Sequence, residues 1–238
     1  MKNCITVFIS IILLSACTKT DHRKVVEQTD GITKEKNERM TVVMADLPIH
    51  IDSTSYLIHP IGNYVFSRNK SDYSKYDDYR SNSYSNTLDV SSNSGDKITG
   101  DISNLKFQNV NSNELKSLTE NTVSIRSILF LRKVFKKNGE GYFLYEVIDK
   151  DTNADGDLDF NDLKSLYISN LNGTAFRKLS PHLQDLVTWK VILEANKLFF
   201  KSIEDTDSNG EFNKKDKMHY FYLDLSDEHS KIVEYYPI

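Results

Sequence analysis

The chain of 238 residues has a formal net charge of −4, and its lysines and arginines are scattered along the sequence. This distribution argues against nucleic acid as a partner, which would favour a basic stripe. Its two cysteines, Cys4 and Cys17, lie near the N-terminus, so the rest of the chain offers no thiol for a disulfide, a nucleophile or a metal.

Residues 1–16 have the features of a secretory signal peptide. Lys2 gives a positive start, and the apolar run from Cys4 to Leu14 is too short to span a bilayer. The run ends in Leu-Ser-Ala before Cys17, which resembles a bacterial lipobox, in which the cysteine thiol is acylated with fatty acids such as palmitate. The alternative is ordinary cleavage nearby, which leaves Cys17 as a free thiol.

The lipobox resemblance implies a mature lipoprotein that begins at Cys17 and is held at a membrane by its acyl chains. Thr18 follows the cysteine, and this resembles the sorting pattern of Gram-negative lipoproteins of the outer membrane. The expected location is therefore the outer membrane, on its periplasmic face or on the cell surface.

Residues 17–45 are polar and mixed in charge, which predicts a tether behind the anchor. Residues 46–238 are enough for one domain with its own core. Within them, residues 71–86 are rich in Tyr, Ser and Asn, a composition that binding loops use. The alternative is a polar insertion that contacts no partner.

The C-terminal half predicts short β-strands and no long amphipathic helix. Runs rich in aromatic and β-branched residues are bounded by Asn, Gly, Asp and Pro, as strands usually are. They cover 142–148, 165–169, 197–200 and 219–225. Asn172 and Gly173, placed between two apolar stretches, indicate a hairpin turn.

Residues 142–181 and 197–237 form an internal repeat. One constant offset aligns the acidic loop and also the strand that follows it. The matched pairs are Asp151 with Asp205, Gly156 with Gly210, Asp162 with Asp216, Tyr167 with Phe221 and Leu171 with Leu225. Residues 104–119 repeat the strand, turn, strand portion without an acidic loop. We therefore expect about three units, at 46–125, 126–190 and 191–238.

Residues 165–181 run from a strand through the Asn-Gly turn to Leu-Ser-Pro, and they resemble a blade repeat of TolB-type β-propellers. The resemblance implies antiparallel meanders arranged like propeller blades. Closed propellers have four or more blades, and this chain is too short for that. The expected fold is all-β: a fan of about three meander units, or an incomplete propeller.

Two segments match the twelve-residue calcium loop, with oxygen-bearing side chains at positions 1, 3, 5, 9 and 12 and Gly at position 6. A hard cation takes six to eight oxygens at about 2.3–2.6 Å, so the chain must coil tightly, and Gly permits the sharp turn. Position 7 contributes its backbone carbonyl. The predicted ligands are Asp151, Asn153, Asp155, Asp157, Asp159 and Asp162 in the first loop and Asp205, Asp207, Asn209, Glu211, Asn213 and Asp216 in the second.

Both loops end in Asp where the EF-hand prefers Glu, and in this they resemble the dockerin variant. Strands and not helices flank them, so the prediction is of calcium loops in a β-domain, with two structural Ca²⁺ sites. The first loop offers four side-chain carboxylates and the second three, so we expect tighter binding in the first. The alternative is a pair of acidic turns that need no metal.

No catalytic motif is apparent: the sequence lacks a nucleophile elbow, a phosphate-cradling Gly-rich loop and an HExxH motif. The six histidines have no metal-ligand spacing and most are expected at the surface. Trp189 is expected in the core and not as a sugar platform.

Two classes of function fit these features. The first is a non-enzymatic envelope lipoprotein whose calcium-stabilised β scaffold binds a protein or a glycan. The second is a surface-attached hydrolase with structural calcium, which requires two carboxylates facing each other in a cleft away from the loops.

Overall fold

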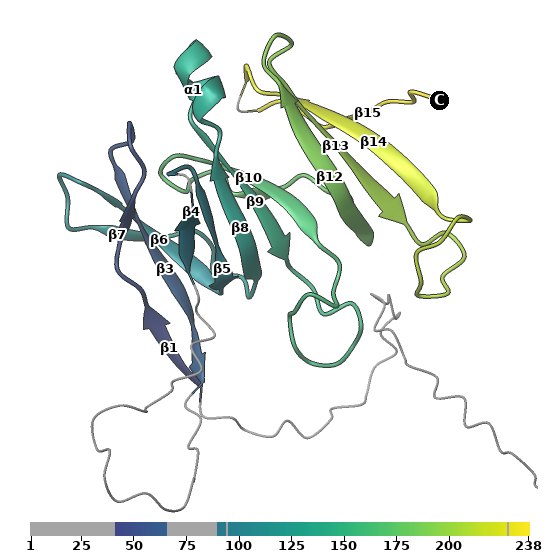
Figure 1. Cartoon of the computed structure of the whole chain (residues 1–238), viewed down its shortest axis with the longest axis horizontal. Coiled ribbons are helices and arrows are strands. Elements are labelled where there is room, and N and C mark those ends of the chain that lie inside the picture. Colours follow the sequence, from purple (N-terminus) through teal and green to yellow (C-terminus); the bar gives the residue numbers. More distant parts are fainter. Residues whose placement is uncertain (1–40, 66–89, 94, 228) are drawn as a thin grey trace, which may run out of the picture.

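The computed structural model describes residues 41–65, 90–93, 95–227 and 229–238. This part of the chain is nearly all β, with three antiparallel sheets and one short helix (Figure 1), which confirms the predicted fold class. The signal peptide, Cys17, most of the tether and the Tyr-rich segment lie outside the described residues. None of the helical structure described is long and apolar enough to cross a membrane.

Sheet A is built around β3 (Tyr56–Val65), which pairs with β1 (Thr41–Ala45), β2 (Ile49–His50) and β6 (Asn104–Asn109). The last strand, β7 (Leu115–Ser117), pairs with β6. The strand, turn, strand predicted at 104–119 is therefore present as β6 and β7.

Sheet B lies in the middle of the molecule. In spatial order its strands are β11 (Arg177–Lys178), β10 (Ser165–Asn170), β9 (Tyr142–Ile148), β8 (Ser124–Phe130), β5 (Lys97–Ile102) and β4 (Ser91–Asn93). The helix α1 (Arg132–Asn138) joins β8 to β9. The predicted Asn-Gly hairpin joins β10 to β11: Gly173 has a φ of 79°, and the Asn170 N–H donates to the Thr174 carbonyl at 2.9 Å.

Sheet C is a four-stranded meander in which each strand pairs with the next along the chain. Its strands are β12 (Gln184–Ile192), β13 (Lys197–Glu204), β14 (Lys217–Asp224) and β15 (Val233–Glu234). All four runs predicted as strands are strands, and β9 has the predicted bounds.

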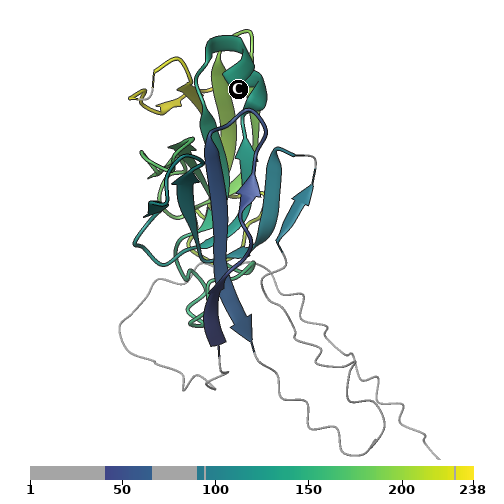
Figure 2. The same ribbon diagram turned by 90° about the vertical axis from the view of Figure 1, so that its left-hand side faces the viewer.

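Two hydrophobic clusters join the three sheets into a stack, which Figures 1 and 2 show from two sides. The first lies between sheets A and B and includes Ile58, Phe107 and Phe143, and the second lies between sheets B and C and includes Leu144 and Leu198. Sheet B thus has both faces covered. This explains why β9 is apolar at nearly every position, since a strand covered on both faces needs no polar side.

The two central strands of sheet C, β13 and β14, alternate in burial instead, because the second cluster covers one face of that sheet. Along β13 and β14 every second side chain is buried, beginning with Leu198 and with His219. Trp189 of β12 is partly exposed and packs against the second cluster, so it lies at the margin of the core.

The three sheets divide the chain differently from the sequence units. β4 and β5 fall in the first unit but extend sheet B beside β8, and β12 lies almost wholly before residue 191 but opens sheet C. The local pattern of a strand indicates which of its faces is buried, but it does not identify the strand with which it pairs.

Candidate metal centre

Each predicted calcium loop connects the two strands of a hairpin, β9 to β10 in sheet B and β13 to β14 in sheet C (Figure 1). The repeat seen in the sequence is also a repeat in the backbone. Ala154 and Ser208 occupy equivalent positions with φ of 59° and 53°, and Gly156 and Gly210 follow with φ of 89° and 78°. Such left-handed conformations allow a short loop to coil back on itself.

In the first loop, the carboxylates at positions 1 and 12 bind backbone N–H groups from inside the coil. Asp151 Oδ2 accepts from Gly156 at 2.8 Å. Asp162 accepts from Thr152 at 2.7 Å through Oδ1 and from Asp159 at 3.0 Å through Oδ2. These bonds point both carboxylates towards the centre of the loop.

The second loop repeats these contacts residue for residue. Asp205 Oδ2 accepts from Gly210 at 2.7 Å, and Asp216 accepts from Thr206 at 3.1 Å and from Asn213 at 2.6 Å. All the other predicted ligands lie on one or other of the two loops; they are Asn153, Asp155, Asp157, Asp207, Asn209 and Glu211.

The two loops differ in how closely their carboxylate oxygens approach one another. In the second, carboxylate oxygens of Asp205, Asp207 and Asp216 all lie within 4.8 Å of one another, a spacing that one cation can bridge. Within the described residues the first loop has no such triad. Its third position is Asn153, whose Nδ2 donates to Asp155 Oδ2 at 3.0 Å.

The first loop instead has a buried oxygen without a partner. Asp151 Oδ1 is inaccessible to solvent and accepts no hydrogen bond, although a carboxylate oxygen in that position costs free energy unless it is paired. A cation in the centre of the loop would supply the missing partner. The oxygen-only donor set suits a hard divalent ion such as calcium.

The first loop is also the more enclosed. Thr152 is 3% exposed and Asp162 is 0% exposed, whereas Thr206 of the second loop is exposed. The residues that leave the first loop connect to sheet C: the Lys164 N–H donates to Asp185 Oδ1 at 2.8 Å, and the Lys164 carbonyl accepts from Leu186 at 2.7 Å. The first loop therefore joins sheet B to sheet C.

The sequence pattern did not predict the cluster formed by His219, Glu204 and Glu234. His219 is 7% exposed, and its Nε2 and Nδ1 lie 2.7 Å from Glu204 Oε2 and from Glu234 Oε1. Glu204 belongs to β13 and Glu234 to β15, so His219 lies between carboxylates from the two strands that flank β14. The alternation of β14 contained the signal, because His219 shares its face with Phe221 and Leu223. The described histidines other than His219 are exposed or partly exposed, as predicted for most of them.

The hydrogen bond from His219 lowers the pKa of Glu234 below the usual glutamate range. Folding therefore favours the ionised carboxylate, and this stabilisation is present above the ordinary glutamate pKa and lost as the pH falls through the lowered value. We expect His219→Leu to raise the pKa of Glu234 towards the ordinary glutamate value, because the substitution removes the hydrogen bond that contributes most to lowering it. Carboxyl ¹³C NMR titration measures this, with Glu114, between β6 and β7 of sheet A, as the control residue. An unchanged titration of Glu234 in the variant would contradict the role given to His219.

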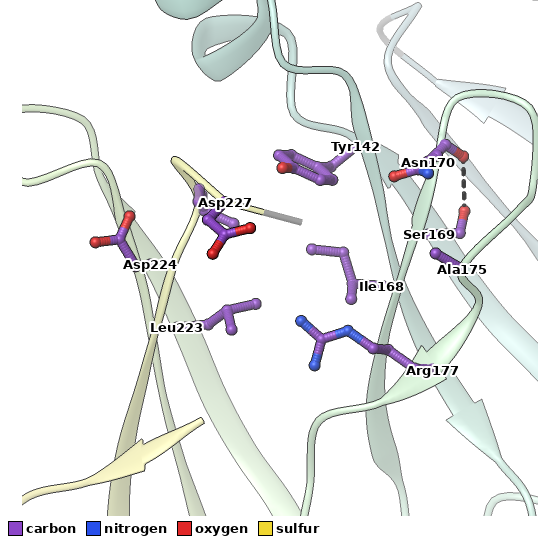
Figure 3. Close-up of a pocket in the computed structure, with 10 residues that line it drawn as sticks. Tyr142, Ile168, Ser169, Asn170, Ala175, Arg177, Leu223, Asp224 and Asp227 are labelled. Atoms are coloured by element: carbon purple, nitrogen blue, oxygen red, sulfur yellow. Dashed lines mark hydrogen bonds between the residues drawn. The ribbon is translucent and has the colours of Figure 1, made fainter. Parts of the chain in front are cut away.

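A small pocket lies between sheets B and C, lined by Ile168 and Arg177 on one side and by Leu223, Asp224 and Asp227 on the other (Figure 3). Its volume is about 10 Å³, which is room for about one water molecule. This pocket is too small for a substrate.

The sequence matches no protein-family model, and neither a curated protein nor a solved structure matches the chain.

Proposed function

We propose that this protein is a non-enzymatic lipoprotein of the bacterial cell envelope, anchored through acylated Cys17, in which two calcium ions stabilise a β scaffold that binds a protein or glycan partner. The observation that carries the proposal is the pair of hairpin loops whose position-1 and position-12 carboxylates turn inward in the same way.

Calcium would be held by the oxygens of Asp151, Asp162 and their neighbours in the first loop and by Asp205, Asp207 and Asp216 in the second. Bound calcium supplies positive charge, which offsets the mutual repulsion of carboxylates that the fold brings together. Its role is structural, because the ligands lie in the loops that close two hairpins and the first loop also joins two sheets. Extracellular sites of this type have dissociation constants of about 10⁻⁴–10⁻³ M, which suits permanent occupancy.

The envelope location is supported by the sequence alone. The lipobox-like Leu-Ser-Ala-Cys17 follows an apolar run with a positive start, and a polar stretch separates it from β1. Each buried methylene of an acyl chain contributes about 0.8 kcal/mol, so more than one chain holds a domain of this size at a bilayer.

The hydrolase alternative requires two carboxylates that face each other across room for a substrate. Among the described residues, Glu204 and Glu234 face each other, but His219 fills the space between them and bonds both. This arrangement fits a fixed structural contact better than a catalytic pair.

Calorimetric titration of the lipidated chain in detergent tests the calcium proposal. We expect two calcium ions per chain, and one ion per chain for Asp151→Asn and for Asp205→Asn. Both substitutions keep the shape of the side chain and remove its charge. Asp46→Asn is the matched control, since Asp46 Oδ1 also accepts a backbone N–H but lies outside both loops. Absence of binding to the parent chain would refute the proposal.

A further inference from the structure

The outer face of sheet C differs from an ordinary solvent-facing sheet surface. Leu198 and Phe200 of β13 point into the second hydrophobic cluster, so Phe199 and Lys201 point outward. Sheet C is the last layer of the stack, and no described element lies beyond it in Figure 1. A solvent-facing side of an antiparallel sheet is usually polar.

Four partly exposed aromatic rings gather on this face. The Tyr235 ring lies 5.7 Å from that of Phe199 and 6.0 Å from those of Tyr220 and Tyr222, measured between centroids. We call this set the aromatic face. The outer side of sheet A has polar contacts instead, such as the 2.8 Å hydrogen bond between His59 and Gln108.

Lysines surround the aromatic face. Lys190 lies opposite Phe199 in the β12–β13 ladder, and Lys201 lies opposite Tyr220 in the β13–β14 ladder. The Lys197 ammonium is 4.1 Å from the centroid of the Tyr222 ring, a cation–π contact.

The acidic side chains of the aromatic face do not balance the positive charge of its lysines. Asp224 lies opposite Lys197, but Lys190 and Lys201 form no ion pair with any described residue. The chain as a whole is acidic, with a formal net charge of −4, so a cationic face is a local departure from its average. Cross-strand aromatic pairs also stabilise a sheet, but unpaired lysines beside them add nothing to that stability.

We propose that the aromatic face of sheet C binds an anionic polysaccharide. Tyrosine and phenylalanine rings pack against the apolar faces of sugar rings, and tyrosine adds hydroxyl groups at little cost in conformational entropy. Lys190 and Lys201 meet the carboxylates or other anionic groups of the polymer, and the open sheet surface accommodates an extended chain. This inference rests on the scaffold role of the proposed function and is independent of its calcium sites.

Affinity electrophoresis of the full chain in gels containing polygalacturonate tests the inference, with dextran as the neutral comparison. We expect polygalacturonate, but not dextran, to retard the chain, and this retardation should weaken as salt is added. Lys190→Glu and Tyr222→Ala should each weaken binding by about tenfold. Tyr222→Phe keeps the ring and should keep most of the affinity. Lys106→Glu, a charge reversal on the outer face of sheet A, should leave binding unchanged.

Other outcomes overturn the proposal. Equal retardation by dextran would show that charge is not recognised, and retardation that survives Lys190→Glu would place the binding elsewhere. Self-association that Lys190→Glu abolishes, without polymer binding, would make the face a contact between copies of this chain. The calcium titration and the electrophoresis separate the two proposals. Binding of polygalacturonate without binding of calcium would support the polysaccharide site and refute the calcium sites. Binding of calcium without binding of polygalacturonate would do the reverse.

Discussion

Calcium should raise the midpoint of thermal unfolding of the lipidated chain, and a chelator should reverse the rise. At a calcium concentration of about a hundred times the dissociation constant, each site adds about 2.7 kcal/mol to the free energy of unfolding. For a domain of this size that corresponds to roughly 5–11 °C per site. Circular dichroism in calcium and in chelator measures the effect.

The two loops should respond unequally. Asp151→Asn removes charge from the loop that joins sheets B and C, whereas Asp205→Asn acts on an exposed hairpin end. We therefore expect the larger loss of the calcium response for Asp151→Asn. In chelator the same substitution should unfold no earlier than the parent chain, because it relieves repulsion among unneutralised carboxylates.

Asp46→Asn is again the control and should respond to calcium as the parent does. Identical midpoints of the parent chain in calcium and in chelator would contradict the metal assignment and leave both loops as acidic turns.

Replacing Cys17 by alanine should release the protein from the membrane. The substitution removes the thiol of the proposed lipobox, and with it every acyl chain that the proposal attaches there. Labelled palmitate should enter the parent protein and be absent from Cys17→Ala, and fractionation should move the variant from the membrane to the soluble fraction.

Cys4→Ala is the matched control, because Cys4 would leave with the signal peptide. It should label and fractionate like the parent. Palmitate in Cys17→Ala, or a Cys17→Ala chain that stays with the membrane, would refute the anchor.

Much of the fold could be predicted from local pattern. The run from Tyr142 to Ile148 has no polar side, and the structure places it in sheet B, both of whose faces are covered. Gly173 marks the turn between β10 and β11, because a φ of 79° is easily reached only by glycine. The pairing of β5 with β8 could not be predicted, because the choice between two possible strand partners depends on packing between sheets and not on the residues of one strand.

The candidate metal site, too, could be predicted only in part. The spacing from Asp151 to Asp162 predicts which residues lie on the loop, but the attachment of Lys164 to Asp185 on another sheet has no local signal. Counting carboxylates favours the first loop as the tighter site, whereas the close triad of oxygens is in the second. His219 could have been recognised from its place in the alternation of β14, but its partner Glu234 comes from a strand of two residues that the sequence pattern does not reveal.

In the described part of the chain the two hydrophobic clusters connect sheets A and C through sheet B, so each sheet packs on its nearest neighbour as in a one-dimensional array. The junction between B and C contains the single tryptophan of the chain: the Trp189 indole N–H donates to Glu146 Oε1 at 3.2 Å, and Glu146 Oε2 lies 3.4 Å from the Lys164 ammonium at the exit of the first loop. The fluorescence of Trp189 therefore reports on the junction between sheets B and C. It distinguishes loosening of sheet C from loosening of sheet A within the same molecule.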